Sequence, residues 1–457
     1  MPQYAGSRLN QTTDLQSTSE NGWIDRLMNP RADGASYQDL KFSLHRKLLG
    51  RVHLEAVLAL PEDRVRREIR TALSHLLDEE DALLNAIERQ RILDEVLDEV
   101  FGLGPLEPLL LDPTISDILV TRPKLVYVER KGKLHRTPVE FKDAAHLTRI
   151  IEKIVSRVGR RIDESSPMVD ARLPDGSRVN AVIPPVAVDG PMLSIRRFGK
   201  VALQSDDLVR SLTWTEGMAE LLQACVAARL NIVVSGGTGA GKTTILNVLS
   251  SFIPETERIV TIEDAAELRL QQMHLARMET RPANIEGNGA IQIRQLVINA
   301  LRMRPDRIVV GEVRGEEALD MMQAMNTGHD GSLTTIHSNN PRDGLSRLEV
   351  MMGMANSSMS VHSIRQQITS AVDLLVHVAR FSDGSRRVTH ITECVGMEGD
   401  TIVSQDIFLF EKKGILSNGR VTGQFRATGI RPKFYEKLRT SGFVLPGSLF
   451  QTVVDLS

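Results

Sequence analysis

Residues 236–243 contain the clearest chemical signal in the chain. They read Gly-Gly-Thr-Gly-Ala-Gly-Lys-Thr and satisfy every position of the phosphate-binding pattern G-x-x-x-x-G-K-[ST]. Glycines allow consecutive backbone N–H groups to turn inward and form a concave nest for anionic oxygens. In this pattern Lys242 reaches the β- and γ-phosphates, which makes it a catalytic as well as a binding residue, and Thr243 holds Mg²⁺. The residues that we expect to contact a nucleoside triphosphate are Gly236, Gly237, Thr238, Gly239, Ala240, Gly241, Lys242, Thr243 and Thr244.

The residues on either side supply the elements that such a loop needs. Residues 230–235 are apolar and β-branched, as in a buried strand, and residues 244–249 place apolar side chains at helical spacing. A helix that starts here directs the positive end of its dipole at the bound phosphates. The strand before and the helix after distinguish this segment from a chance glycine-rich turn.

Two apolar segments downstream end in acidic residues. Residues 259–262 are followed by Glu263, and residues 307–311 by Glu312. Ligands of parallel sheets gather at the carboxyl ends of the strands, and triphosphate hydrolysis needs acids for Mg²⁺ and for the attacking water. We expect Glu263 to polarise the water and Glu312 to join Thr243 in the magnesium shell, although these two roles could be exchanged.

Two histidines, His329 and His337, flank a short predicted strand. A neutral imidazole can donate to a γ-phosphate oxygen and report its loss. Zinc is not indicated, because no nearby cysteine or third histidine completes a tetrahedral set. We therefore predict that both histidines serve the nucleotide site; a structural or surface role is the alternative.

Seven arginines fall between Arg157 and Arg197. Arg172, Arg178 and Arg196 lie in strand-like segments with polar neighbours. Arginines supplied by another domain or subunit can stabilise the charge of a phosphoryl-transfer transition state. For any one of them an ordinary surface ion pair is the alternative, but we expect at least one to be functional.

Composition excludes several classes of protein. The net charge of −2 creates no global attraction to nucleic acid or anionic lipid. Two cysteines, Cys225 and Cys394, cannot build a disulfide framework or a four-thiolate zinc site. No signal-like segment or membrane-length apolar run is present. The sequence thus predicts a cytoplasmic protein that reaches a membrane only through partners.

The pattern of residues divides the chain into four segments. Residues 1–35 are polar and predict a disordered tail, whereas residues 36–104 have helical apolar spacing. Residues 105–200 mix strand and helix patterns and predict an α+β domain. In residues 201–457 helix and strand alternate through residue 380 and strand signals follow, which predicts a three-layer α/β domain.

In their order, the motifs resemble those of the secretion and pilus ATPases of the type II/type IV secretion superfamily. The phosphate loop corresponds to Walker A, residues 261–267 to an aspartate box, and residues 327–337 to a histidine box. Residues 311–315 correspond to an atypical Walker B, in which Glu312 replaces the usual Asp. The four-cysteine zinc module of some type II secretion ATPases is absent from the sequence.

Within this superfamily the chain is similar to the CpaF branch, which powers Tad (type IVc) pili. The matching stretches are residues 101–110, 159–173, 363–368 and 428–432. One departure is Thr121-Arg122-Pro123, where the family often has Asn-Gly-Pro. This difference could alter a turn but touches no catalytic motif.

The resemblance implies a RecA-like P-loop ATPase domain, preceded by an α+β (PAS-like) domain and a helical segment. It also implies ATP and Mg²⁺ as cofactors and a homohexamer that binds nucleotide between subunits or domains. Closure and opening of the domains would push on an inner-membrane platform protein and so assemble, or also retract, a Tad pilus from the cytoplasmic face.

Two alternatives remain open: a type II/IV secretion or DNA-transfer motor, and a RecA-like nucleic-acid translocase. Aromatic content of 4% and balanced charge disfavour the translocase, so no direct contact with nucleic acid is expected.

Overall fold

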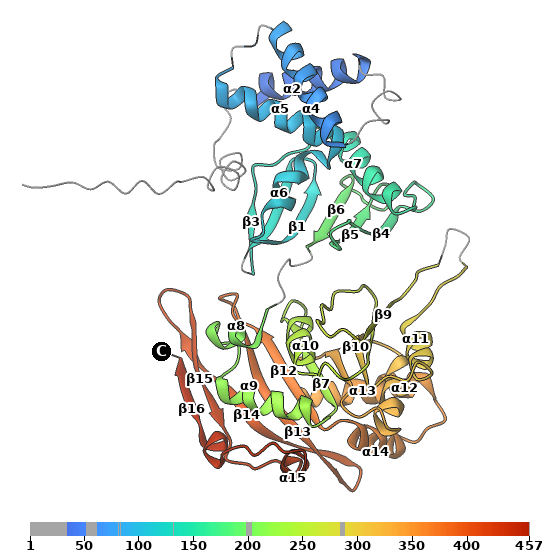
Figure 1. The fold of residues 1–457 in the computed structure, drawn as a ribbon, viewed down its shortest axis with the longest axis vertical. Coiled ribbons are helices and arrows are strands. Elements are labelled where there is room, and N and C mark those ends of the chain that lie inside the picture. Colours follow the sequence, from blue (N-terminus) through green and yellow to red (C-terminus); the bar gives the residue numbers. More distant parts are fainter. Residues whose placement is uncertain are drawn as a thin grey trace, which may run out of the picture. The chain divides into compact units, whose positions relative to one another are not determined.

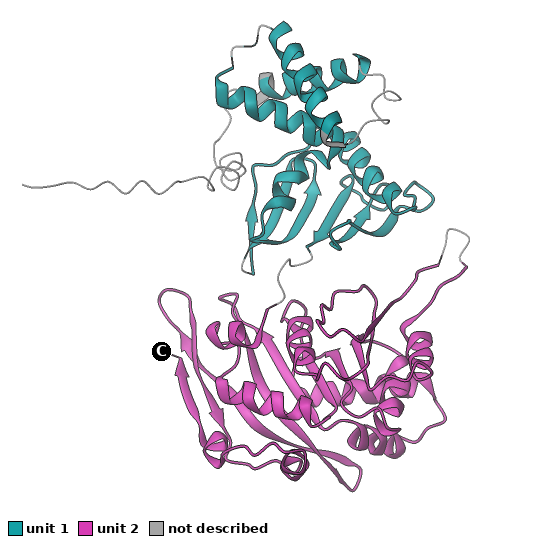
Figure 2. Cartoon of the chain, in the orientation of Figure 1, with its two compact units in different colours: residues 1–200 teal, residues 201–457 magenta. Residues whose placement is uncertain are grey.

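The computed structural model of the 457-residue chain forms two compact units, residues 1–200 and 201–457 (Figure 2). The residues that the structure describes are 34–51, 62–80, 82, 84–130, 132–197, 203–283 and 288–456. The predicted disordered tail lies outside the described residues, except that residues 34 and 35 belong to the first described helix.

Unit 1 begins with three described helices, which are α2 (Gly34–Arg51), α4 (Glu62–Glu79) and α5 (Ala86–Phe101) (Figure 1). Leu44, Leu73 and Val96, one from each helix, are fully buried in a common core. Apolar residues spaced at helical intervals form one stripe on each helix, and burying these stripes against one another removes them from water. This packing forms a small helical core.

The rest of unit 1 is a six-stranded antiparallel sheet with the strand order β3-β2-β1-β6-β5-β4. Helix α7 (Ala144–Arg157) packs on it through Leu147, Ile151 and Ile154, which lie on one face of the helix. The other elements are η1 (Gly104–Leu106), α6 (Glu107–Leu111), β1 (Ile115–Arg122), β2 (Leu125–Arg130), β3 (Lys133–Arg136), β4 (Met168–Arg172), β5 (Arg178–Val182) and β6 (Met192–Arg196).

A buried charged cluster joins the helical core to α7. Glu99 of α5 lies 2.9 Å from Nε2 of His146 and 3.1 Å from Nζ of Lys41. Burial alone would raise the pKa of Glu99, but the hydrogen bond from His146 and the charge of Lys41 hold that pKa at about 2. The cluster keeps a buried carboxylate ionised and links three helices of unit 1.

Unit 2 is built on a ten-stranded sheet with the order β16-β15-β14-β13-β12-β7-β11-β10-β8-β9. The strands from β12 to β9 in this order pair in parallel, and those from β12 to β16 pair antiparallel. The strands are β7 (Ile232–Gly236), β8 (Ile259–Glu263), β9 (Leu275–Glu279), β10 (Arg307–Val313), β11 (Leu333–His337), β12 (Leu374–Arg380), β13 (Arg386–Glu398), β14 (Thr401–Ile415), β15 (Val421–Ala427) and β16 (Val453–Leu456).

Helices cover both faces of this sheet, each over its own apolar core. On one face lie α8 (Ser205–Arg210), α9 (Glu216–Ala227), α10 (Lys242–Ser251) and α15 (Tyr435–Thr440). On the other lie α11 (Ile293–Ala300), α12 (Glu317–Asn326), α13 (Pro341–Ala355) and α14 (Val361–Ala371). The 3-10 helix η2 (Gly447–Gln451) precedes β16. The predicted mixed α/β class is confirmed. Because helices cover both faces of the sheet, neither face of its parallel strands meets water, and the sequences of these strands are near-continuous apolar runs.

Buried polar groups hold the loop before β11 at the amino edge of the parallel strands. The Asn231 side-chain oxygen accepts from the N–H groups of Gly331 (2.8 Å) and Ser332 (3.0 Å). Arg307, which is fully buried, donates to Gly331 O at 3.1 Å and forms an ion pair with Glu257 at 2.5 Å. The guanidinium therefore has little freedom to move away from the loop.

Gly331→Ala should destabilise unit 2 more than Gly328→Ala. Both glycines have left-handed backbones (φ 82° and 93°), so each alanine costs roughly 1–2 kcal/mol of backbone strain. A Cβ at Gly331 would also collide with the fixed guanidinium of Arg307, whereas one at Gly328 meets nothing within 4 Å. We expect an additional loss of roughly 1–3 kcal/mol for Gly331→Ala, measured by urea unfolding. Equal losses in the two variants would show that Arg307 is free to move.

Candidate functional site

The phosphate loop connects the end of β7 to the start of α10. Gly239 and Gly241 have left-handed backbones (φ 68° and 100°), which residues with a Cβ rarely adopt. A Cβ on Gly236 would collide with the carbonyl of Val378 in β12. Helix α10 has no side-chain cap at Gly241, so no side chain there competes with an anion for the first helical N–H groups. The loop fits a bound phosphate.

Lys242 and Glu312 lie close together beside this loop. The Lys242 ammonium is 3.8 Å from a Glu312 oxygen and donates to Gly237 O at 3.3 Å. Burial lowers the pKa of Lys242, while Glu312 opposes the shift. Arg314 also donates to Glu312 (2.6 Å) and to Asp264 (3.1 Å). Glu312 thus stands between two cations at the mouth of the loop, and its oxygens together with the Thr243 hydroxyl are the ligand types that Mg²⁺ prefers.

Glu263 has a different environment. It ends β8, is 3% exposed, and accepts the N–H groups of Glu267 (2.7 Å) and Leu268 (2.9 Å) with one oxygen. Its other oxygen is buried and has no hydrogen-bond partner among the described residues. Burial raises the pKa of Glu263 to about 7, against the two backbone donors that lower it. This carboxyl is therefore suited to exchanging a proton near neutral pH.

Strand pairing brings Glu263 near Glu312. Strands β8 and β10 are parallel neighbours, and the Cγ of Glu263 would lie only 3.0 Å from a Cβ built on Gly311. The glycine before Glu312 is thus what allows the close approach. Asp264 and Glu267, which belong to the predicted aspartate box, are half-buried in the loop that follows β8, and their charges act on Arg314.

The two histidines lie at opposite ends of β11. His337 ends the strand and pairs in register with Gly236, the first glycine of the phosphate loop. His329 precedes the strand and lies at the other edge of the sheet, where its carbonyl accepts from Ser332 at 2.7 Å. Of these two predicted histidines, His337 is therefore the one that lies beside the phosphate loop of its own chain, and a nucleotide role for His329 stays a prediction.

Three further side chains lie close to the phosphate loop and were missed by sequence reasoning. His377 of β12 hydrogen-bonds Ser235 at 2.9 Å, and burial lowers its pKa to about 4, so it is neutral. Arg386 donates to Gly239 O at 3.0 Å, and the Arg380 guanidinium lies 3.2 Å from a Cβ built on Gly239. They come from the hairpin β12–β13, more than a hundred residues downstream, so no local pattern could have revealed them.

The predicted arginines form a row in unit 1. Arg172 of β4 is directly opposite Arg178 of β5, which is directly opposite Arg196 of β6. Arg196 also forms an ion pair with Asp117 at 3.2 Å. The register therefore brings the three predicted arginines together on one face of the sheet.

The family described as "Type II/IV secretion system protein" matches residues 99–422. The chain belongs to this family. It is 40% identical over 307 residues to a putative conjugal transfer protein of Mycobacterium tuberculosis, covering 66% of this chain and 87% of the relative. It is 34% identical over 314 residues to the type IV secretion system protein PtlH of Bordetella pertussis, covering 63% and 92%. The predicted superfamily is confirmed, and ATP use by this family implies nucleotide binding.

Two solved structures also match part of this chain. The VirB11 ATPase of the Brucella suis type IV secretion system, in complex with sulphate, is 28% identical, with a TM-score of 0.35 over 64% of this chain and 97% of that chain. The Legionella pneumophila ATPase DotB is 20% identical, with a TM-score of 0.45 over 63% and 79%. In the part of the chain that the structure describes, no helix of this secretion-family protein is long and apolar enough to cross a membrane.

Glu263→Gln should stabilise the protein at alkaline pH. Because folding raises the carboxyl pKa from 4.5 to about 7, the folded state binds more protons than the unfolded state between these values. The free energy of unfolding that Glu263 contributes therefore falls as pH rises through this window. The variant should gain roughly 1–3 kcal/mol relative to the parent on going from about pH 5 to about pH 8, measured by urea unfolding.

Glu255→Gln, in an exposed loop, controls for the loss of a carboxylate. If Glu263→Gln and the parent lose stability in parallel between the two pH values, the raised pKa of Glu263 is wrong.

Proposed function

We propose that this chain hydrolyses ATP and works as a motor subunit of a type II/IV secretion or pilus machine. The observation that carries the proposal is one sheet edge of unit 2, where Lys242, Glu312 and His337 surround the phosphate loop. Family membership supports it independently. Unit 2 is then the RecA-like ATPase domain, and the sheet of unit 1 is the PAS-like domain.

Different side chains would carry out the different parts of ATP hydrolysis. The phosphate loop and Lys242 bind the triphosphate, and Thr243 with Glu312 would hold Mg²⁺, which neutralises phosphate charge. Glu263, with its pKa near neutrality and one unpartnered oxygen, would polarise the attacking water. His337 is placed beside the first loop glycine, where it can respond to the γ-phosphate.

The arginine row of unit 1 would complete the site when the protein assembles. In a homohexamer, Arg172, Arg178 and Arg196 would approach a nucleotide bound to unit 2 of the same or a neighbouring copy. Their alignment in one row supports this role, because neighbouring guanidinium groups can bind the oxygens of one phosphate. Release of the phosphate after hydrolysis would let the two units move apart. This movement would transmit force to an inner-membrane platform protein at the cytoplasmic face.

Two kinds of machine have specific support as the one that this chain drives. The stretches at 159–173, 363–368 and 428–432 resemble the CpaF branch and favour a Tad pilus. The similarity to a putative conjugal transfer protein and to conjugal transfer protein TrbB of Rhizobium radiobacter, at 32% identity over 292 residues, favours a DNA-transfer or secretion machine. We place the Tad pilus first because its stretches lie outside the shared nucleotide motifs.

Lys242→Ala should weaken ATP binding by roughly tenfold or more, because it removes a charge-assisted contact to the phosphates.

Glu312→Gln should keep ATP affinity but lower turnover roughly 100-fold, the effect of removing one electrostatic group from an active site. Binding of a fluorescent ATP analogue and phosphate release measure the two effects.

Lys433→Ala, at an exposed position outside the site, is the matched control. Normal hydrolysis in Glu312→Gln would contradict its assignment. Full loss of turnover in Glu267→Gln, with normal turnover in Glu263→Gln, would move the water-polarising role to Glu267.

The kind of machine that the chain drives can be tested by measuring which partner raises its rate of ATP hydrolysis. If the chain drives a pilus, the cytoplasmic domain of a Tad platform protein should raise its ATPase rate several-fold, because a motor is coupled to its load, and single-stranded DNA should not. Stimulation by a conjugation platform domain instead would favour DNA transfer. Stimulation by single-stranded DNA alone would contradict both and favour a nucleic-acid translocase.

A further inference from the structure

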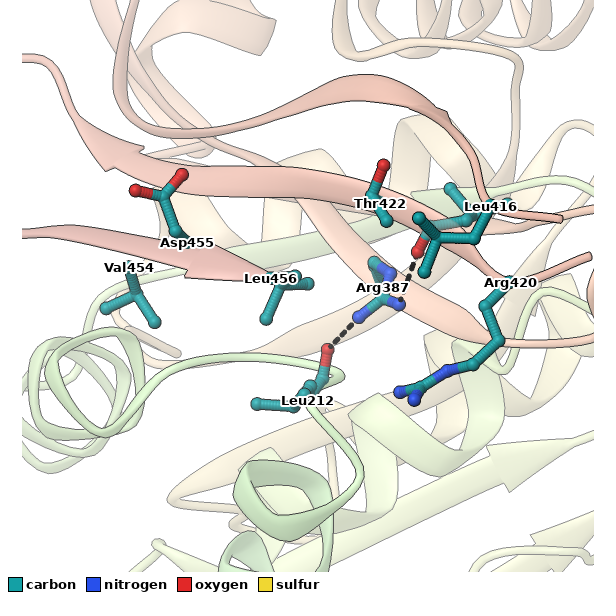
Figure 3. A pocket seen from close by; sticks show the side chains of 9 residues that line it. Leu212, Arg387, Leu416, Arg420, Thr422, Val454, Asp455 and Leu456 are labelled. Carbon is teal, nitrogen blue, oxygen red and sulfur yellow. Dashed lines mark hydrogen bonds between the residues drawn. The ribbon is translucent and has the colours of Figure 1, made fainter. Parts of the chain in front are cut away.

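A cavity of about 200 Å³ lies in unit 2, and its lining includes none of the predicted nucleotide-binding residues (Figure 3). It lies where β13 and β15 begin and β14 and β16 end, and it is partly open to solvent. Its lining includes the guanidinium groups of Arg387 and Arg420 and five aliphatic residues, which are Leu212, Leu416, Val421, Val454 and Leu456. The lining therefore combines an apolar wall with two positive charges.

Among the described residues Arg387 is a buried cation that forms no salt bridge, and its guanidinium carbon lies 5.2 Å from the centroid of the Phe410 ring. It is 5% exposed and donates only to backbone carbonyls, to Leu212 O at 3.0 Å and Val421 O at 3.4 Å. Its Nε is buried and lacks a hydrogen-bond partner in the described part of the chain. Burial lowers the pKa of Arg387; Asp383 opposes this shift and Arg420 adds to it. A buried charge without an ion pair destabilises the fold unless something else neutralises it.

The acids near the cavity are already engaged. Asp455, in the lining, lies 2.7 Å from the ammonium of Lys413. Asp383 accepts from the N–H of Val421 (2.8 Å) with one oxygen and from Ser385 with the other. Among the described residues, neither Arg387 nor Arg420 forms a salt bridge. Two guanidinium groups therefore line the cavity against one carboxylate, Asp455, which is itself paired with Lys413.

We propose that this cavity binds a small carboxylate carried on a short apolar group. The guanidinium plane matches the two oxygens of a carboxylate, and the aliphatic wall would remove the apolar group from water. The volume of the cavity is below that of ordinary drug-sized sites, which favours a ligand smaller than a nucleotide. Inorganic phosphate would satisfy the charge but leave the aliphatic wall without a partner.

The cavity shares β13 with the phosphate loop. Arg386 donates to Gly239 O, and the next residue along the strand, Arg387, lines the cavity. The N–H of Val388 then donates to Thr213 O at 2.7 Å, which holds the segment that carries Leu212 against β13. The carboxylate would thus bind one residue from a contact with the phosphate loop.

The test is a titration of the nucleotide-free full chain with butyrate at constant ionic strength, followed through Leu and Val methyl NMR signals. We expect saturable shifts in the methyls of Leu212, Leu416, Val454 and Leu456 at millimolar butyrate. Butyramide, which has nearly the same shape without the charge, should bind about tenfold more weakly, as the loss of a charge-assisted hydrogen bond predicts. Inorganic phosphate should also bind more weakly than butyrate.

Arg387→Gln should abolish these shifts, and Arg420→Gln should weaken butyrate several-fold. Arg439→Gln, an exposed arginine of α15, is the matched control and should change nothing. Because Arg387→Gln could fail to fold, the exposed Arg420 and the comparison with butyramide decide the question independently. Equal binding of butyrate and butyramide, phosphate binding as tight as butyrate, or an unchanged affinity in Arg420→Gln would overturn the proposal.

Discussion

The parallel pairing of β12, β7, β11, β10 and β8 is the constraint on which the site depends. Parallel strands must all end at the same edge of a sheet, so residues from distant parts of the chain meet there without any local signal. This pairing sets His337 opposite Gly236 and places Glu312 within 3.8 Å of Lys242. The two apolar cores on either face hold the strands in that register, since a slip would expose buried side chains.

The protein buries several ionisable groups, and their surroundings shift the pKa values of two buried carboxyls in opposite directions. Glu99 is paired with His146 and Lys41, so its pKa falls to about 2. Glu263 receives only two backbone donors, so burial dominates and its pKa rises to about 7. Both carboxyls are buried, and the presence or absence of a cationic partner decides the direction of the shift. A structural carboxylate and a proton-exchanging one thus arise from the same residue type.

Much of the site could be predicted from the chain itself, because a phosphate loop is a local motif. The glycines and Lys242 are contiguous, and the strand-end position of Glu312 follows from the apolar run before it. The different surroundings of Glu263 and Glu312 could not be predicted, because they depend on which backbone N–H groups and cations fold around each carboxyl. Arg386 and His377 were also beyond prediction, since each touches the loop from a strand far along the chain.

The sequence by itself therefore determined the mixed α/β class, the family and the nucleotide loop, all of which rest on short-range spacing of residue types. Only the tertiary structure decided which residues meet. It separated His329 from His337, aligned the three arginines across β4, β5 and β6, and left Arg387 buried beside a cavity with no salt bridge to any described residue. The physical reason is that strand order and register, which place distant residues in contact, are set by the packing of the whole sheet rather than by any one segment.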